Sequence, residues 1–283
     1  MQRTAFEFTL RDDDVLRGDV WTPPDSARPE VAIVVCHGFK GFKDWGFFPY
    51  LCGQLADKTG CTTVGFNFTG SGVGSDLMNF TELDKFGHNT FSRELSDLSE
   101  VLQRLRQGEL AEGVEVASRF GVFGHSRGGA AAVITASENE DVGAVATWAA
   151  ISSVERYEKS FVEELEANGV VYITNARTGQ EMPLYPDILA DIRENRARLD
   201  ILGAVATMTC PYLIVHGDAD MTVPVAEARA LADAAGRNGR LEVIAGAGHT
   251  MGSVHPFLEA GPHLQGAAAA TAEHYRRHLV GTE

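Results

Sequence analysis

Continuous apolar runs alternate with amphipathic segments along this 283-residue chain. Runs rich in β-branched and aromatic residues predict strands buried on both faces, at 31–36, 62–66, 120–123, 142–148, 212–215 and 241–244. Helical periods lie between them, at 47–58, 91–106, 127–137, 225–235 and 265–280. The clearest helical pattern is at 91–106, where the charged residues lie opposite a face that carries four leucines: Leu95, Leu98, Leu102 and Leu105. This alternation predicts a mostly parallel, doubly wound α/β sheet with right-handed crossovers.

The N-terminal segment departs from this alternation. Residues 4–22 alternate apolar and polar positions around a turn-like segment, 11–14, and 23–26 close the pattern. A period of two is typical of strands with one buried face. We therefore expect an antiparallel hairpin before the parallel strands.

A second departure covers residues 152–207, which are charged and irregular. Here we expect a hairpin formed by 170–173 and 180–182 around the turn 175–179. A helical period then runs through Ile188, Ile192 and Leu199. Since this segment lies between two predicted sheet strands, we interpret it as a lid inserted into a core of residues 1–151 and 208–283.

Composition narrows the class of protein. A hydrophobic content of 44% with 22% charged residues is typical of a globular chain with a core. The net charge of -15 repels phosphate backbones and no Lys/Arg cluster opposes it, so we expect no nucleic-acid partner. The charged N-terminus and the lack of a long apolar window predict a cytoplasmic protein without a membrane span. The cysteines lack CxxC spacing and are interpreted as reduced core thiols: Cys36, Cys52, Cys61 and Cys210.

Chemically active residues follow the predicted strands. In open α/β sheets, ligands bind beyond the carboxyl ends of the strands. Those ends carry HGFKG at 37–41, GHSRGG at 124–129, HGDAD at 216–220 and GAGH at 246–249. Four such segments on separate strands predict one shared site.

GHSRGG fits a strand-turn-helix nucleophile elbow around Ser126. Alone it is also compatible with a polar turn, but an apolar strand precedes it and a helix-forming alanine run follows it. A serine hydroxyl needs a base and an orienting carboxylate to react at neutral pH. Asp220 and His249 follow later strands and supply both, in the chain order Ser, Asp, His.

With these motifs the chain resembles the α/β-hydrolase family. The resemblance implies that Ser126 is the nucleophile, Asp220 the acid and His249 the general base. It also implies an oxyanion hole made by the backbone N–H groups of Phe39 and Arg127. Asp218 is the rival of Asp220, and His255 that of His249.

Within the family, the chain is most similar to small bacterial esterases of the cinnamoyl or feruloyl type. The similarity rests on the hairpin at 175–181 and on aromatic residues after the HGF loop: Phe42, Trp45, Phe47 and Phe48. It implies a serine hydrolase that cleaves small carboxylic esters through an acyl-enzyme. A thioesterase, a peptidase or a carbon-carbon bond hydrolase would use the same triad, and a binding protein could keep the fold without reacting.

Other features give no competing function. The glycine-rich segment 69–75 fails the dinucleotide spacing and is interpreted as a flexible loop near the active-site rim. The sequence contains no HExxH motif. His274 and His278 lie four residues apart, but two solvated side chains are at least as good an explanation as two metal ligands. We therefore expect neither a metal nor a cofactor. Three large aromatic residues either line the acyl pocket or pack in the core or lid, and we favour packing: Trp148, Tyr172 and Tyr185.

Two questions stay open on the sequence alone. The Arg127 side chain either pairs with a carboxylate at the pocket rim or is solvated, and we favour the pairing. The oligomeric state is undetermined, with a homodimer as one option.

Overall fold

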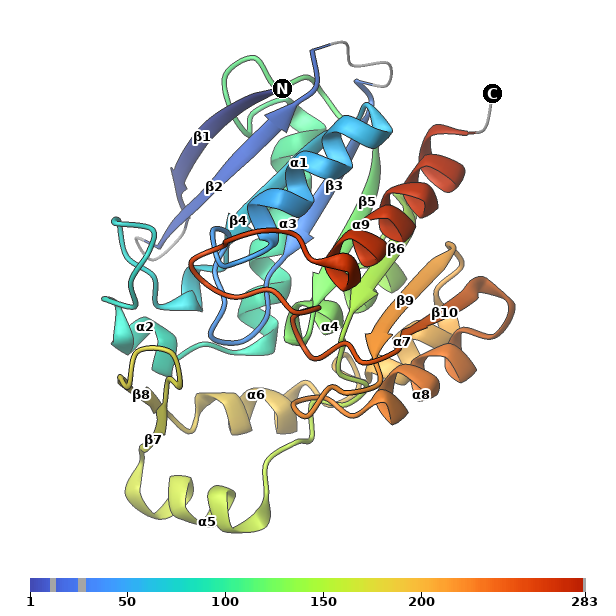
Figure 1. The fold of residues 1–283 in the computed structure, drawn as a ribbon. Helices are drawn as coiled ribbons and strands as arrows, with labels where there is room; N and C mark the ends of the chain where they lie inside the picture. The colour runs from blue at the N-terminus through green and yellow to red at the C-terminus, as the bar shows by residue number, and fades with distance from the viewer. Residues whose placement is uncertain (11–13, 25–28, 282–283) are drawn as a thin grey trace.

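A twisted, mostly parallel sheet runs through the middle of the protein (Figure 1). A computed structural model describes residues 1–10, 14–24 and 29–281. Within these residues the sheet has eight strands, in the order β1-β2-β4-β3-β5-β6-β9-β10. Their bounds are β1 Gln2–Thr9, β2 Val15–Thr22, β3 Val31–Cys36, β4 Thr62–Asn67, β5 Arg119–His125, β6 Val142–Trp148, β9 Tyr212–Gly217 and β10 Gly239–Ile244. Each predicted strand coincides with one of these within a few residues.

The N-terminal hairpin is confirmed. Strands β1 and β2 pair antiparallel, with Gln2 opposite Thr22, and β2 also pairs antiparallel with β4. From β4 to β10 the neighbouring strands are parallel. The predicted turn at 11–14 and the closing segment at 23–26 lie partly outside the described residues.

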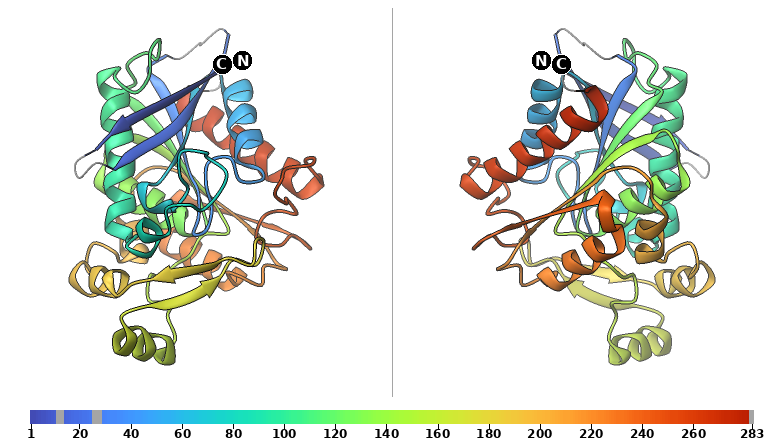
Figure 2. Two further views of the ribbon diagram at one scale, coloured as in Figure 1. Left: turned by 90° about the vertical axis from the view of Figure 1, so that its left-hand side faces the viewer. Right: turned by 90° about the vertical axis from the view of Figure 1, so that its right-hand side faces the viewer.

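Helices cover both faces of the sheet (Figure 2). Helices α1 (Phe48–Thr59) and α9 (Pro262–Tyr275) pack together on one face, and a π-helical turn at Arg276–Val280 extends α9. Helices α3 (Phe91–Gln107), α4 (Arg127–Glu138) and α8 (Val225–Ala235) cover the other. In the part of the chain that the structure describes, no helix is long and apolar enough to cross a membrane.

Helix α3 shows how local sequence sets its ends. The Thr90 side chain accepts a hydrogen bond from Arg93 N, and Gly108 closes the helix at φ 70°. The four predicted leucines are buried, as the apolar period indicates. The expectation that the charges face solvent is wrong at two positions, because Glu94 and Asp97 are also buried.

The segment between β6 and β9 lies beyond the carboxyl ends of these strands (Figure 1). It contains α5 Lys159–Asn168, β7 Val171–Thr174, β8 Glu181–Leu184, α6 Asp187–Glu194 and α7 Ile201–Thr207. The predicted hairpin is present as β7 and β8. Helix α5 was not predicted, and Leu199 falls between α6 and α7 rather than in one continuous helix. We call residues 152–207 the insertion.

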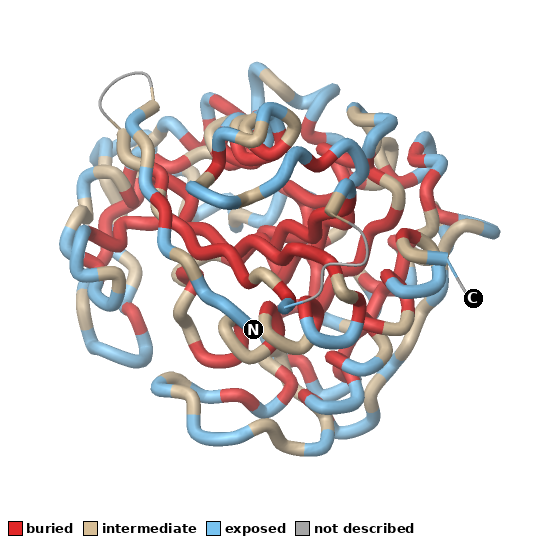
Figure 3. Tube along the Cα trace, turned by 90° about the horizontal axis from the view of Figure 1, so that it is seen from above, coloured by how far each residue is buried: buried red, intermediate tan, exposed pale blue. Residues whose placement is uncertain are grey.

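The buried residues lie mainly in and around the central sheet. Buried residues form a continuous band along the strands, and exposed residues concentrate in the surrounding loops (Figure 3). The four cysteines are buried and none forms a disulfide within the described residues, in agreement with core thiols. The glycine-rich segment 69–75 begins with a 3₁₀ turn, Thr69–Ser71, and residues 69–74 are buried rather than exposed as a loose surface loop. Its conformation is fixed by Asp97, which accepts hydrogen bonds from Thr69 N and Oγ1. Between it and α3 lies the short helix α2, Leu83–Gly87.

Candidate active site

Ser126 lies at a sharp turn between β5 and α4. Strand β5 ends at His125 and α4 begins at Arg127, so Ser126 alone makes the turn. Its backbone has φ 54° and ψ -120°, a conformation that is strained for a residue with a Cβ. The Ser126 N–H donates to Trp148 O at 2.9 Å, which anchors the turn to β6. The predicted elbow is therefore present.

Two glycines make room for the elbow. A Cβ at Gly124 would lie 2.2 Å from the carbonyl oxygen of Gly128, and a Cβ at Gly128 would lie 2.3 Å from that of His37. Neither backbone oxygen can rotate away as a side chain could. Only glycine fits at these positions, as the GxSxG pattern indicates.

Asp220 and His249 form a hydrogen-bonded pair. Asp220 follows β9, His249 follows β10, and His249 Nδ1 donates to Asp220 Oδ2 at 2.8 Å. The other carboxylate oxygen accepts from the N–H groups of Thr222 and Val223 at 2.8 and 2.9 Å. Burial raises the pKa of Asp220, but the hydrogen bonds from His216 and His249 outweigh it and hold the pKa well below its usual range. The carboxylate is thus ionised where it orients the imidazole.

Ser126 and His249 line the same cavity. Among the described residues the structure records no hydrogen bond between Ser126 Oγ and the His249 ring, although the cavity holds both side chains. Such contacts often tighten only when substrate binds.

The two rival residues have other partners. Asp218 is exposed and accepts from Gly246 N at 2.6 Å, which ties the loop after β9 to the loop after β10. His255 accepts from Gly46 N at 3.0 Å, and its ring contacts Trp45 and Phe42. Neither residue lines the cavity that contains Ser126.

The proposed oxyanion donors also reach this cavity. Phe39 lies in the loop after β3, Arg127 is the first residue of α4, and both line the cavity. For neither backbone N–H does the structure record an acceptor among the described residues. His37 shapes this loop, since its ring bonds to Gly38 O at 2.9 Å and to Phe68 N at 3.2 Å. Burial lowers the pKa of His37 to about 4, so its ring is neutral at pH 7.

His125 is a site residue that the sequence analysis missed. Its Nε2 bonds to the carbonyl oxygen of His249 at 2.9 Å, and the two ring centroids are 4.8 Å apart. Burial lowers the pKa of His125 to about 3, so the neutral ring donates to that carbonyl. The residue before Ser126 therefore positions the loop that carries the His249 imidazole.

The Arg127 side chain forms the expected ion pair, but with a deeply buried partner rather than one at the rim. Its Nε donates to Glu94 Oε2 at 2.9 Å, with the two side chains 7% and 5% exposed. Asn89 Nδ2 donates to the other Glu94 oxygen at 2.8 Å. The guanidinium also lies 4.0 Å from the ring centre of Phe91. This pair connects α4 to α3 directly beside the elbow.

The cavity around Ser126 has a volume of about 590 Å³, a size typical of small-molecule sites. Aromatic side chains form much of its wall: Phe39, Trp45, Phe48, Phe91 and Tyr157. Trp148 is fully buried and does not line the cavity, in agreement with the packing interpretation. Tyr185 is half-buried and also lies outside the cavity wall. Tyr172 is 59% exposed, so for this residue both the pocket and the packing interpretations are wrong.

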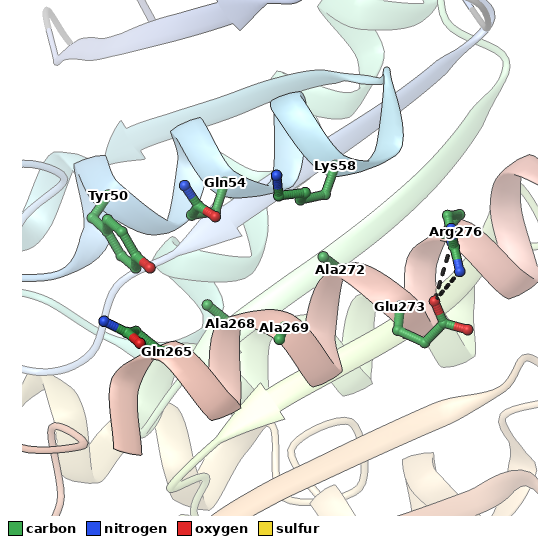
Figure 4. Close-up of a pocket in the computed structure, with 9 residues that line it drawn as sticks. All are labelled: Tyr50, Gln54, Lys58, Gln265, Ala268, Ala269, Ala272, Glu273 and Arg276. Atoms are coloured by element: carbon green, nitrogen blue, oxygen red, sulfur yellow. Dashed lines mark hydrogen bonds and ion pairs between the residues drawn. The ribbon is translucent and has the colours of Figure 1, made fainter. Parts of the chain in front are cut away.

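A second hollow of about 430 Å³ lies between α1 and α9 (Figure 4). Its polar side chains include Tyr50, Lys58 and an ion pair between Glu273 and Arg276. No serine or histidine of the described chain lines it. Across the described ranges, no group of three or more His, Cys, Asp or Glu residues could hold a metal ion. The elbow cavity is therefore the candidate active site.

The sequence and fold match a known family. The sequence profile of the Alpha/beta hydrolase family matches residues 33–261. The chain belongs to the α/β-hydrolase family. Membership supports a hydrolytic activity, and the matched range contains the elbow, Asp220 and His249. No curated protein matches the sequence.

Solved α/β-hydrolase structures superpose over almost the whole chain. The esterase domain of a Rhodothermus marinus protein is 21% identical, with a TM-score of 0.66, and the match covers 98% of this chain and 99% of that one. Est1E from Butyrivibrio proteoclasticus, solved with ferulic acid bound, is 18% identical at a TM-score of 0.69, covering 95% and 97%. A monoacylglycerol lipase from Paleococcus ferrophilus is 14% identical at 0.65, covering 96% and 98%. At these identities the likeness concerns the fold alone.

Proposed function

We propose that this α/β-hydrolase is a serine esterase whose triad is Ser126, His249 and Asp220. The observation that carries the proposal is the His249–Asp220 hydrogen bond beside a serine held at a strained elbow in the same cavity. A binding protein would need neither the strain nor the buried pair. Both are what a nucleophilic mechanism requires.

The chemistry follows from the positions of these groups. His249 Nε2 takes the proton of Ser126 Oγ as that oxygen attacks the ester carbonyl carbon. Ionised Asp220 holds Nδ1–H and stabilises the imidazolium that forms. The imidazolium then protonates the leaving alcohol, and water, deprotonated by the same ring, hydrolyses the acyl-enzyme to acid and free Ser126.

Negative charge develops on the carbonyl oxygen at both steps. The N–H groups of Phe39 and Arg127 are free to bind it, and the Arg127 N–H lies at the N-terminus of α4, where the helix dipole favours an anion. Loss of one such donor typically costs about 3 to 4 kcal/mol of transition-state stabilisation.

The insertion acts in this proposal as a lid. It contributes part of the cavity wall: Val154, Arg156, Tyr157, Asn175, Ala176 and Arg177. The remaining wall comes from the core at residues 1–151 and 208–283. Substrate would therefore be enclosed between the two parts.

An ester substrate is supported by the aromatic wall and by the structures with a similar fold, which include an esterase domain and a monoacylglycerol lipase. The same triad in a thioesterase or peptidase would show a higher kcat/KM for thioesters or amides. Comparing p-nitrophenyl acetate with the matched thioester and anilide decides between these classes.

The triad is tested by substitution. Ser126→Ala, His249→Ala and Asp220→Asn are expected to lower kcat for p-nitrophenyl acetate by about 10³-fold or more. Asp218→Asn and His255→Gln are the matched controls, because each replaces a rival residue outside the cavity, and we expect kcat within a few-fold of wild type. Undiminished turnover by Ser126→Ala would refute the proposal.

A further inference from the structure

The charged side chains that line the cavity are opposite in sign to the net charge of the protein. The chain carries a net charge of -15, yet four cationic side chains line the cavity and, among the described residues, no Asp or Glu does. The four are Lys40, Arg127, Arg156 and Arg177. Whether they attract an anion depends on how many are already neutralised by carboxylates behind the wall.

Two of the four are neutralised. Arg127 pairs with buried Glu94 at 2.9 Å. Arg156 Nη1 donates to both carboxylate oxygens of Glu227 on α8, at 2.6 and 2.7 Å. These two arginines fix α4 and the insertion to neighbouring helices and leave little net charge for a ligand.

Lys40 and Arg177 form no ion pair with any residue that the structure describes. The hydrogen bond recorded for Lys40 Nζ is to the backbone oxygen of Thr174, at 3.5 Å, and Nζ lies 6.0 Å from the ring centre of Phe39. The Arg177 guanidinium forms no hydrogen bond with any described residue, and its backbone N–H donates to Asn175 Oδ1 at 3.1 Å. Two positive charges at the cavity therefore lack a carboxylate partner in the described part of the chain.

The backbone at Lys40 strengthens the argument. Lys40 has φ 56°, in the left-handed region that glycine adopts without strain. Gly38 and Gly41 are its near neighbours in the same loop, so glycine is tolerated in this segment. A strained lysine beside Phe39 is better explained by the charge it places at the cavity than by the turn it makes.

We infer that the substrate is an ester that carries an ionised carboxylate, which Lys40 and Arg177 bind. The inference rests on the proposed esterase function and names its substrate class. Lys40 belongs to the core loop after β3, whereas Arg177 belongs to the β7–β8 turn of the insertion. Thr174, which Lys40 contacts, is the last residue of β7 and directly precedes the turn that carries Arg177, so the two cations lie on adjoining segments. A carboxylate between them would join the insertion to the core while Ser126 reacts with the ester group.

The test compares an anionic ester with its neutral counterpart. Monomethyl adipate and its carbamoyl analogue differ only in whether the distal group is a carboxylate or an amide. 6-Acetoxyhexanoate and its amide place the same difference on the alcohol side. Acid release in a pH-stat gives kcat/KM for each, and we expect wild type to prefer one anionic ester about tenfold or more. The preferred pair shows whether the carboxylate belongs to the acyl or the alcohol part.

The variants are Lys40→Gln, Arg177→Gln and the double variant. Each single change is expected to lower the anionic-to-neutral ratio of kcat/KM about threefold or more, and the double change brings it near one. The ratio cancels any general loss of activity. Lys159→Gln and Arg237→Gln are controls that remove the same charge from exposed positions outside the cavity, and they should keep the wild-type ratio.

A second readout separates this inference from the proposed function. In the Ser126→Ala protein, binding of monomethyl adipate and of its neutral analogue is measured by calorimetry, with and without Arg177→Gln. Tighter binding of the anion that is lost in the Arg177 variant supports the inference even without turnover. Hydrolysis of both esters at equal rates, or equal binding of both analogues, overturns it and leaves the esterase proposal intact.

Discussion

The buried ion pair between Arg127 and Glu94 yields a prediction whose size follows from its geometry. At 2.9 Å and an effective dielectric constant of about 20, the Coulomb attraction is about 6 kcal/mol. Desolvation offsets part of this, but removing one partner leaves the other charge buried and alone. Breaking such a pair costs about 3 to 5 kcal/mol. The side chains are almost fully buried, so solvent screening is small. We therefore expect Arg127→Met to lose about 3 to 5 kcal/mol of unfolding free energy.

The assay is urea denaturation of a double-mutant cycle. Glu94→Gln keeps an oxygen that can accept from Asn89, and the double variant Arg127→Met/Glu94→Gln removes both charges together. We expect the double variant to be more stable than the sum of the single losses by about 2 to 3 kcal/mol. A cost below about 1 kcal/mol for Arg127→Met, or strictly additive losses, would refute this reasoning.

The same cycle has a pH dependence with a definite sign. Burial raises the pKa of Glu94, and Arg127 opposes that rise. Without Arg127 the pKa rises further, so folded Glu94 holds a proton that the unfolded chain releases as pH increases. Stability therefore falls with rising pH. Arg127→Met should cost more at pH 8 than at pH 5.

Two further predictions concern buried groups near the site. Replacing His125 with Ala removes the hydrogen bond to the His249 carbonyl, and kcat of the folded protein should fall about 10- to 100-fold. His125→Asn, whose amide can donate to that carbonyl, should recover part of the loss, and equal losses in both variants contradict the role. Burial raises the pKa of Asp97 from its usual value to about 7, so the folded state retains a proton that the unfolded chain loses, and stability should fall as pH rises from about 4 to 7. Urea titrations at pH 5 and pH 8 should show a smaller fall in Asp97→Asn, and an unchanged fall assigns the effect to another group.

The strands were predictable because each is a continuous apolar run buried on both faces. The run at 31–36 coincides with β3, and the run at 120–123 predicts β5 with its elbow at the following turn. The place of the candidate site could be predicted for the same reason, since the residues after parallel strands meet at one edge of the sheet. The triad candidates were then chosen because a serine nucleophile needs a base and an orienting carboxylate.

The features that could not be predicted from the sequence depend mainly on contacts between distant segments. Glu94 and Asp97 lie on the buried face of α3, where a helical period assigns charges to solvent, because their partners come from α4 and from the loop after β4. His125 bonds to a carbonyl 124 positions away, for which no local pattern exists. Helix α5 buries only Leu165, so its sequence lacks the apolar period that reveals a packed helix.

The central claim is that Ser126 is an activated nucleophile. Fluorophosphonates form a covalent bond with such a serine, and peptide mass spectrometry locates the adduct. We expect one adduct per chain on the peptide containing Ser126, its loss in Ser126→Ala, and slow labelling of His249→Ala, with Asp218→Asn labelled at the wild-type rate. An unlabelled Ser126 in the folded wild-type protein, or labelling that persists in Ser126→Ala, would contradict it.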